Sequence, residues 1–468
     1  MLKPAGTNSL WFGQVDAINT TIWAQFPEVN PNQQRVELNV RQTVFYPQKT
    51  GINFLTVRGF VLRNAATPWT PPTAEQIGLI GTHWSKGWII ESNLISHSRC
   101  SGITLGKYGD AWDNTSANSS GGYVLTIQRA LTNDWNGSTV GHHVVRDNEI
   151  SHCEQTGICG SLGAIFSTIS GNKIHDIHVQ RQFGGAEMGG IKFHAAIDCV
   201  ISSNHIYRTY RRLWLDWMAQ GTRVSGNLFH DNSTQDLYTE VDHGPFLVDN
   251  NIFLSPVNLW DMSEGGAYAH NLMTGIIISQ PDHARSTPFH SPHSVNIAGF
   301  TNIAGGDHRF YSNLFIGDGG SRRELEKLKP PPTSPIFSPQ GAGFGLCAYD
   351  VRDVPIYTGG NVYLHGATPW KNETDATVHA TFDPSVKLVR RKDGFFLELK
   401  LKDHLQPARN RLVTTALLGK ASIPNAAYEN PDGPSLQIDT NFFDAKLNRQ
   451  SVTDGPFRNS SSGARKLR

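Results

Sequence analysis

A weak repeat of apolar and polar positions runs through most of the chain. Each copy has an apolar residue, an asparagine three positions later, and a second apolar residue two positions after the asparagine. The clearest copies are centred on Asn93, Asn148, Asn172, Asn204, Asn227, Asn251 and Asn313, with weaker ones at Asn271 and Asn361. Between Asn148 and Asn271 the steps are 24, 32, 23, 24 and 20 residues. A period of about 20–24 residues predicts stacked coils of a solenoid.

The fold that this period favours is all-β, a right-handed parallel β-helix. In such a solenoid, each coil contributes short strands that pair in parallel with the coils above and below. Asparagines that point inward at a bend stack as a ladder of amide groups, so we interpret them as structural. The leucine-dense consensus of leucine-rich repeats is missing, and a β-propeller needs blades of about 40 residues.

The segments outside the repeat have a different pattern. Residues 1–48 contain the strand-like TTIWAQF and RVELNVRQTVFYP without the asparagines, and the alternating VKLVRRKDGFFLELKLKD leads into a polar tail. We expect strands at 1–48, a β-helix catalytic domain at 49–384, and a strand-rich extension at 385–468 that packs on the helix.

Composition and charge narrow the classes of function. The 41 basic residues nearly balance the 40 acidic ones, so no broad positive field exists to hold nucleic acid or an anionic membrane. No apolar run reaches the ~18 residues of a membrane span and no secretion signal is visible, so we expect a cytoplasmic protein. No metal-ligand spacing is visible, so neither a metal nor a cofactor is expected. The cysteines form no CxxC pair and are interpreted as small apolar residues: Cys100, Cys153, Cys159, Cys199 and Cys347.

A second strand in each coil aligns as GITLG (102–106), GICGS (157–161), GIKFH (190–194), RLWLD (212–216) and DLYTE (236–240). Because side chains alternate along a strand, one set is expected to point inward: Ile191, Phe193, Leu213, Leu215, Leu237, Thr239 and Val241. The other set is expected to face solvent: Lys192, His194, Trp214, Asp216, Asp236, Tyr238 and Glu240. The last outward positions then form a vertical column on successive coils, made of Gly106, Ser161, His194, Asp216 and Glu240.

The spacing of two carboxylates in this column, Asp216 and Glu240, predicts the chemistry of a glycosidase. Adjacent strands lie ~4.7–4.9 Å apart, so the two groups should be about 5 Å apart, near the ~5–5.5 Å of a retaining glycosidase and short of the ~6.5–9.5 Å of an inverting one. Like charges this close raise one pKa, so that one group stays protonated. On this hypothesis Asp216 attacks the anomeric carbon, and Glu240 protonates the leaving oxygen and later activates water. Glu187, just before GIKFH, is a candidate to tune Asp216.

Residues suited to sugar binding surround the two carboxylates. Trp214, Trp217 and Tyr238 offer aromatic faces to a sugar ring, and His194 and His243 offer donors to its hydroxyls. The alternative interpretation is structural: outward acids on a solenoid are usually just solvated, and tryptophans often pack under a loop.

The segment LWLDWMAQGTRVSGNLFHDNSTQDLYTEVDHGPFLVDNNIF (213–253) resembles the catalytic stretch of the β-xylosidases of glycoside hydrolase family 120. In that family the aspartate of WLDW is the nucleophile and the glutamate before HGP is the acid/base, which implies these roles for Asp216 and Glu240. Glu187 in GGAEMGGIKFH matches an acidic residue that influences the nucleophile. The similarity continues through 43–95 and 413–433.

This resemblance implies a β-helix body with a β-sandwich inserted near the N-terminus. Family members are longer there, so residues 1–48 are expected to be the last strands of the sandwich, with the first coils missing. It also implies a retaining, exo-acting β-xylosidase that hydrolyses β-1,4-xylo-oligosaccharides or a related small glycoside.

Two other functions stay open. A pectate lyase-like enzyme would need a cluster of acidic residues to bind Ca²⁺ and arginines to bind the carboxylates of a uronate substrate. Arg211 and Arg212 could supply these arginines, so this alternative remains. A carbohydrate-binding or structural β-helix without catalysis is the second alternative.

Overall fold

The structure, a computed structural model, describes residues 10–26, 29–115, 119–181, 183–185, 187–321, 341–401, 412–447, 454–457 and 463–467. The chain divides into two compact units, Met1–Val40 and Arg41–Arg468. In the first unit, β1 (Trp11–Val15) and β2 (Thr20–Ala24) pair as an antiparallel hairpin, and a short 3-10 helix, η1 (Pro31–Gln33), follows.

Residues 41–48, expected among the strands of the N-terminal part, belong instead to the second unit. Phe45 forms a parallel bridge with Ile80, and the Val44 amide donates to the Leu79 carbonyl at 2.9 Å. The end of the segment RVELNVRQTVFYP is therefore irregular chain that lies along the first coil.

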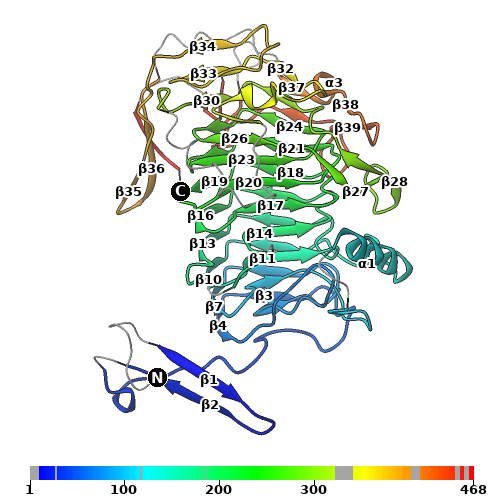
Figure 1. Cartoon of the computed structure of the whole chain (residues 1–468), viewed down its shortest axis with the longest axis vertical. Helices are drawn as coiled ribbons and strands as arrows, with labels where there is room; N and C mark the ends of the chain where they lie inside the picture. Colours follow the sequence, from blue (N-terminus) through cyan, green and yellow to red (C-terminus); the bar gives the residue numbers. More distant parts are fainter. Residues whose placement is uncertain are drawn as a thin grey trace. The chain divides into compact units, whose positions relative to one another are not determined.

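The second unit is built from three long sheets that wind around a common interior (Figure 1). Sheet 1 contains β5 (Ile80–Gly81), β8 (Ile103–Thr104), β11 (Thr156–Ser161), β14 (Gly189–His194), β17 (Leu213–Asp216), β20 (Gln235–Glu240), β23 (Val257–Met262), β26 (Ile276–Ser279) and β31 (Gly341–Gly343). Sheet 2 contains β3 (Thr56–Arg58), β6 (Ile89–Glu91), β9 (Val144–Arg146), β12 (Thr168–Ser170), β15 (Val200–Ser202), β18 (Arg223–Ser225), β21 (Phe246–Asp249), β24 (Gly266–Ala269), β29 (Arg309–Tyr311) and β32 (Tyr357–Gly359). Sheet 3 contains β4 (Val61–Ala65), β7 (Leu94–Ser98), β10 (Glu149–Cys153), β13 (Lys173–Ile177), β16 (His205–Thr209), β19 (Leu228–His230), β22 (Ile252–Phe253), β25 (Leu272–Met273), β30 (Leu314–Ile316), β33 (Val362–Leu364) and β34 (Thr377–His379).

Neighbouring strands in these sheets pair in parallel, except for β31, which pairs antiparallel with β26. Each coil passes through sheet 2, then sheet 3, then sheet 1 before the next coil begins. The parallel β-helix predicted from the repeat is therefore confirmed.

The repeated asparagines form a continuous ladder at the bend between sheets 2 and 3. The Asn93 side-chain nitrogen donates to the side-chain oxygen of Asn148 at 3.0 Å, and the same bond recurs along the ladder to Asn361 at 2.9–3.1 Å. Each Asn side chain also donates to a backbone carbonyl of its own or the preceding coil, such as Asn204 to Ile169 at 2.9 Å. Buried amides that are fully hydrogen-bonded cost little to bury, which explains polar residues in the interior.

The apolar positions on both sides of each asparagine fill the interior. Ile90, Val145, Ile169 and Ile201 before the asparagines are fully buried, and the aromatic residues of later coils stack, as Phe229 and Phe253 do at 5.0 Å between ring centroids. Buried apolar area of this kind supplies most of the stability of a solenoid.

Further elements cover the outside of the coils. They are helix α1 (Ser120–Thr132), η2 (Leu346–Tyr349), the hairpin β27 (Asp282–His290) and β28 (Ile297–Ile303), the sheet β35 (Lys387–Arg391), β36 (Gly394–Leu399) and β41 (Gly463–Lys466), and the small elements β37 (Val413–Thr414), α3 (Thr415–Leu418), β38 (Lys420–Ala421), β39 (Ala426–Ala427) and β40 (Gln437–Ile438). Leu397 and Leu399 of β36 pack with Leu228 and Ile252 of sheet 3. Among the described residues, no helix has the length and apolar character that crossing a bilayer requires.

Candidate active site

The predicted column of outward residues lies at the ends of successive strands of sheet 1. Ser161 ends β11, His194 ends β14, Asp216 ends β17 and Glu240 ends β20, and each is the register partner of the next. The two carboxylates therefore occupy adjacent parallel strands, whose usual spacing is ~4.7–4.9 Å.

These strands end together because the chain turns sharply at the same place in each coil. Leu162, Ala195, Trp217 and Val241, which follow the column residues, all have left-handed backbone, with φ between 51° and 65°. The interpretation of Val241 as an inward residue was wrong: the left-handed turn ends the alternation, and Val241 belongs to a separate apolar cluster that also contains Trp217 and Tyr123.

The outward residues do not face open solvent as expected. His194 and Asp216 are only 5% and 3% exposed, and Lys192, Trp214, Asp236 and Tyr238 are buried as well. Insertions that the repeat does not contain cover this face and leave a cleft of about 190 Å³. The cleft is lined by Pro72, Thr73, Ser119, Ser120, Tyr123, Glu187, His194, Trp214, Asp216, Trp217, Glu240 and Arg285.

Asp216 is held through one oxygen only. Its Oδ2 lies 2.9 Å from Lys192 Nζ and 3.0 Å from His194 Nε2, whereas Oδ1 is buried without a hydrogen-bond partner among the described residues. Burial alone would raise the pKa of Asp216, but the charges of His194 and Lys192 more than offset it and lower the pKa. Asp216 therefore lines the cleft as an ionised carboxylate, and its Oδ1 accepts no hydrogen bond from the described residues.

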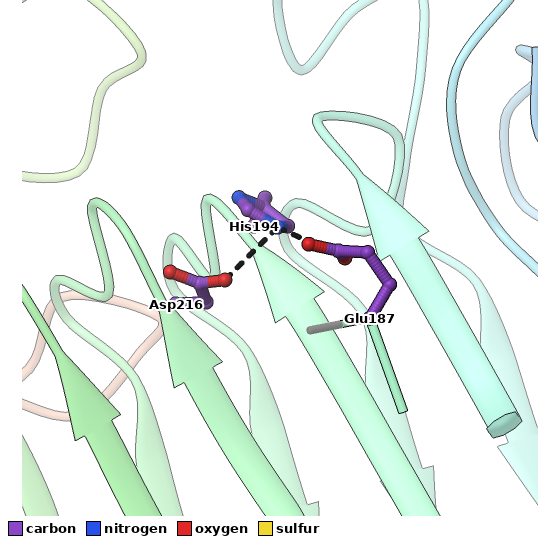
Figure 2. A group of neighbouring side chains, drawn as sticks. All are labelled: Glu187, His194 and Asp216. Carbon is purple, nitrogen blue, oxygen red and sulfur yellow. Dashed lines mark ion pairs between the residues drawn. The ribbon is translucent and has the colours of Figure 1, made fainter. Parts of the chain in front are cut away.

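Glu187 contacts Lys192 and His194, the two side chains that hold Asp216. Its Oε2 pairs with Lys192 Nζ and lies 3.5 Å from His194 Nε2, so that His194 stands between Glu187 and Asp216 (Figure 2). Burial opposes ionisation of Glu187, but Lys192 and His194 lower its pKa, and the pKa of His194 is raised because Asp216 outweighs the effect of burial.

Glu187, His194 and Asp216 also have the donor types and the spacing of a metal site, with ligand atoms within 4.8 Å of one another. The Lys192 ammonium, however, pairs with both carboxylates of this group. It already supplies the positive charge that a metal ion would bring, and a second cation there would be repelled. By this balance of charge, the three side chains form an ion-pair network with Lys192.

The pKa of Glu240 is shifted in the direction opposite to that of Asp216. Burial and the neighbouring charge of Asp216 raise its pKa, and Arg285 and Lys192 only partly oppose this effect. Arg285 Nη1 lies 2.7 Å from Glu240 Oε1. The two carboxylates thus differ in the way that acid and nucleophile must differ.

Of the three aromatic residues predicted to bind sugar, two line the cleft and one does not. Trp214 and Trp217 line the cleft, whereas Tyr238 lies behind Trp214, with ring centroids 5.1 Å apart, and its hydroxyl donates to Met262 Sδ at 3.0 Å. Lys192 Nζ lies 3.5 Å from the Trp214 ring centroid. A sugar stacked on that face of Trp214 would have to displace this cation.

His243, a second candidate donor to substrate, does not line the cleft. Its Nδ1 lies 2.9 Å from Glu264 Oε1 and its Nε2 lies 2.9 Å from Thr287 Oγ1, so both ring nitrogens are engaged. The reason is the turn after Glu240, which directs His243 toward the hairpin β27–β28.

Sequence reasoning did not assign Lys192, Arg285 or Tyr123 to the site, nor the cleft-lining residues Pro72, Thr73, Ser119 and Ser120. Lys192 lies two positions before His194 on the same face, so the alternation that identified His194 also places Lys192 beside it. Arg285 and Tyr123 come from insertions outside the repeat, where coil periodicity carries no signal.

A family model and one solved structure agree with the fold. A family model described as a right-handed β-helix region matches residues 77–280. A solved structure of XylC in complex with xylose is 40% identical, with a TM-score of 0.88, over 98% of this chain and 73% of that one. The Dettilon tailspike protein gp208 is a distant match, 11% identical with a TM-score of 0.24 over 47% of this chain and 53% of that one. No curated protein sequence matches significantly.

Proposed function

This chain belongs to glycoside hydrolase family 120, and from that premise we propose that it is a retaining, exo-acting β-xylosidase. The single observation that carries the proposal is the pair of register partners Asp216 and Glu240, whose pKa values are shifted in opposite directions at one cleft. The complex of its relative XylC with xylose supports a xylose-related glycoside as the substrate.

In the first step, Asp216 Oδ1 attacks the anomeric carbon and the bond to the leaving oxygen breaks. Glu240 gives its proton to that oxygen, so that the aglycone leaves neutral and the sugar is held as an ester of Asp216. The unpartnered Oδ1 supports this role, because no hydrogen bond from the described residues has to break before attack.

In the second step, water attacks the same carbon and the ester bond to Asp216 breaks. Glu240, now ionised, takes the proton of the water, and the free sugar leaves with its original anomeric configuration. Lys192 and His194 stabilise the carboxylate that is released, since both contact its Oδ2.

The size of the cleft supports action on a terminal sugar. Its volume of about 190 Å³ is below the ~300–1,000 Å³ of ligand sites for larger molecules. A cleft of this size suits one small ring, as exo-cleavage of xylo-oligosaccharides requires.

The lyase alternative has less support. Arg212 is fully buried, with its Nε 3.5 Å from Asp236 Oδ1, and Arg211 lies over the Trp214 and Tyr238 rings. Neither arginine lines the cleft. Products that absorb in the ultraviolet would indicate a lyase and contradict a hydrolase.

The test uses Asp216→Ala, Asp216→Gly and Glu240→Ala with an aryl β-xyloside. Each alanine variant should lose at least ~10³-fold in kcat, because these groups touch the reacting atoms. Azide should restore turnover of Asp216→Gly with inversion and of Glu240→Ala with retention. If both alanine variants stay active while circular dichroism shows an intact fold, the assignment is wrong. A panel of aryl glycosides then compares xylose with arabinose.

A further inference from the structure

The hairpin β27–β28 interrupts the repeat between β26 and β29 (Figure 1). It carries Arg285, which lines the cleft. Arg285 Nη1 lies 2.7 Å from Glu240 Oε1, and Arg285 Nε lies 2.6 Å from Asp282 Oδ2. The Arg285 backbone amide also donates to Asp282 Oδ1 at 2.9 Å. Arg285 is therefore fixed by its own strand on the side away from Glu240.

The hairpin is attached to the turns that follow β17 and β20, the strands that end in Asp216 and Glu240. Thr287 Oγ1 donates to the Val241 carbonyl at 3.1 Å and lies 2.9 Å from His243 Nε2. Gln220 holds the end of β27 with a pair of bonds to His290, donating to its carbonyl at 2.8 Å and accepting from its amide at 3.0 Å. Thr287 and His290 are fully buried. The position of Arg285 is thus fixed relative to Glu240.

We propose that Arg285 is a positioning residue that stabilises the ionised form of Glu240 during the second, hydrolytic step, and that His243 and Gln220 serve the site by fixing the hairpin. This inference rests on the retaining mechanism proposed above. It gives the hairpin a part in this step beside Lys192 of the coils, which also lowers the pKa of Glu240.

The charges around Glu240 explain why such a group is needed. The groups that face it are Asp216 from β17, Lys192 from β14, Arg285 from β27, Tyr238 from its own strand and Asp242 from the following turn. Burial and Asp216 favour the protonated form, as the first step requires. The second step requires the anion, and Arg285 is the cation in direct contact with it.

The experiment compares Arg285→Gln and Arg285→Lys on 2,4-dinitrophenyl β-xyloside. Its leaving group, dinitrophenolate, departs as an anion and needs no proton from Glu240. Loss of Arg285 should raise the pKa of Glu240, so Glu240 stays protonated and water is activated slowly. We expect Arg285→Gln to lower kcat and KM together by roughly tenfold or more, with a burst of dinitrophenol. The acid limb of its kcat profile should move to higher pH, and azide, which needs no base, should restore kcat. Arg285→Lys should retain most of the activity.

A matched control is Arg208→Gln, which removes the Arg208–Asp176 pair on the outside of sheet 3 and should leave the pH profile unchanged. If the pH dependence of kcat in Arg285→Gln equals that of the wild type, the role of Arg285 is wrong. The same holds if kcat falls equally for aryl xylosides with good and poor leaving groups and azide does not restore it. Failure of azide to rescue Glu240→Ala would instead reject the underlying mechanism, so the two failures are distinguishable.

Discussion

The two oxygens of Asp216 have different surroundings, and this difference determines what the residue can do. Oδ2 is held by Lys192 and His194, whereas Oδ1 has no hydrogen-bond partner in the described part of the chain. A carboxylate buried at 3% exposure would ordinarily bind a proton, because burial disfavours charge. Lys192 and His194 lower its pKa and keep it ionised, so in the proposed mechanism attack through Oδ1 needs no preceding deprotonation.

Lys192→Met should therefore raise the pKa of Asp216. A carboxylate with a lowered pKa is ionised above that pKa and loses its charge as the pH falls through it. Without Lys192, the acid limb of kcat/KM should move to higher pH, and kcat should fall by roughly tenfold or more, since a hydrogen bond to a charged group contributes about 1.5–3 kcal/mol and only His194 then holds Oδ2. The pH dependence of aryl xyloside hydrolysis measures this shift. An acid limb that does not move would contradict the role of Lys192.

At this scale, part of the site was predictable from the sequence. Alternation along short strands located His194, Asp216 and Glu240 in one column, because strand register in a solenoid follows from the spacing of the repeat. Burial of the column was not predictable, since it depends on insertions such as the hairpin of Arg285. The direction of His243 was not predictable either, because the left-handed turn at Val241 ends the alternation.

The asparagine ladder is the element that holds the coils in register. Asn204 illustrates its bonding: the side chain donates to Ile169 O and Asn227 Oδ1, and its Oδ1 accepts from the amide and the side chain of Asn172. The ladder was predictable because a polar residue at a fixed place in an apolar repeat needs a buried partner, and the same residue of the next coil provides one. The loops between repeats, which form the cleft, follow no period.

Asn204→Ala should destabilise the protein by about 3 kcal/mol or more, since each buried group left without a partner costs about 1–3 kcal/mol. Urea unfolding followed by circular dichroism measures this loss. The exposed Asn296 gives a matched control, and Asn296→Ala should change stability by no more than about 0.5 kcal/mol. Equal stability of the two variants would show that the ladder is not needed.

Across the second unit, the coils and the C-terminal segments share apolar contacts on two sides. The sheet of β35, β36 and β41 packs on sheet 3, and the small elements from β37 to β40 pack on sheet 2 through residues such as Leu247 and Tyr428. The sequence indicated a strand-rich extension, but not which faces it covers, because side-chain packing between distant segments leaves no periodic signal.

Leu397→Ala tests whether the extension and the coils unfold together. Leu397 is fully buried against sheet 3, so its truncation should cost about 2–5 kcal/mol and move the whole urea transition to lower concentration. Ile423→Ala, at a site that is 37% exposed, should have little effect. Two separate transitions in Leu397→Ala would show that the extension unfolds independently.

The central claim is that Asp216 forms a covalent bond to the sugar while Glu240 acts as acid and base. Incubation with a 2-deoxy-2-fluoro-β-xyloside that carries a good leaving group, followed by proteolysis and peptide mass spectrometry, tests it most directly. The account predicts time-dependent inactivation and one labelled peptide, with the fluorosugar on Asp216. A label on another residue, or hydrolysis without any covalent intermediate, would contradict it.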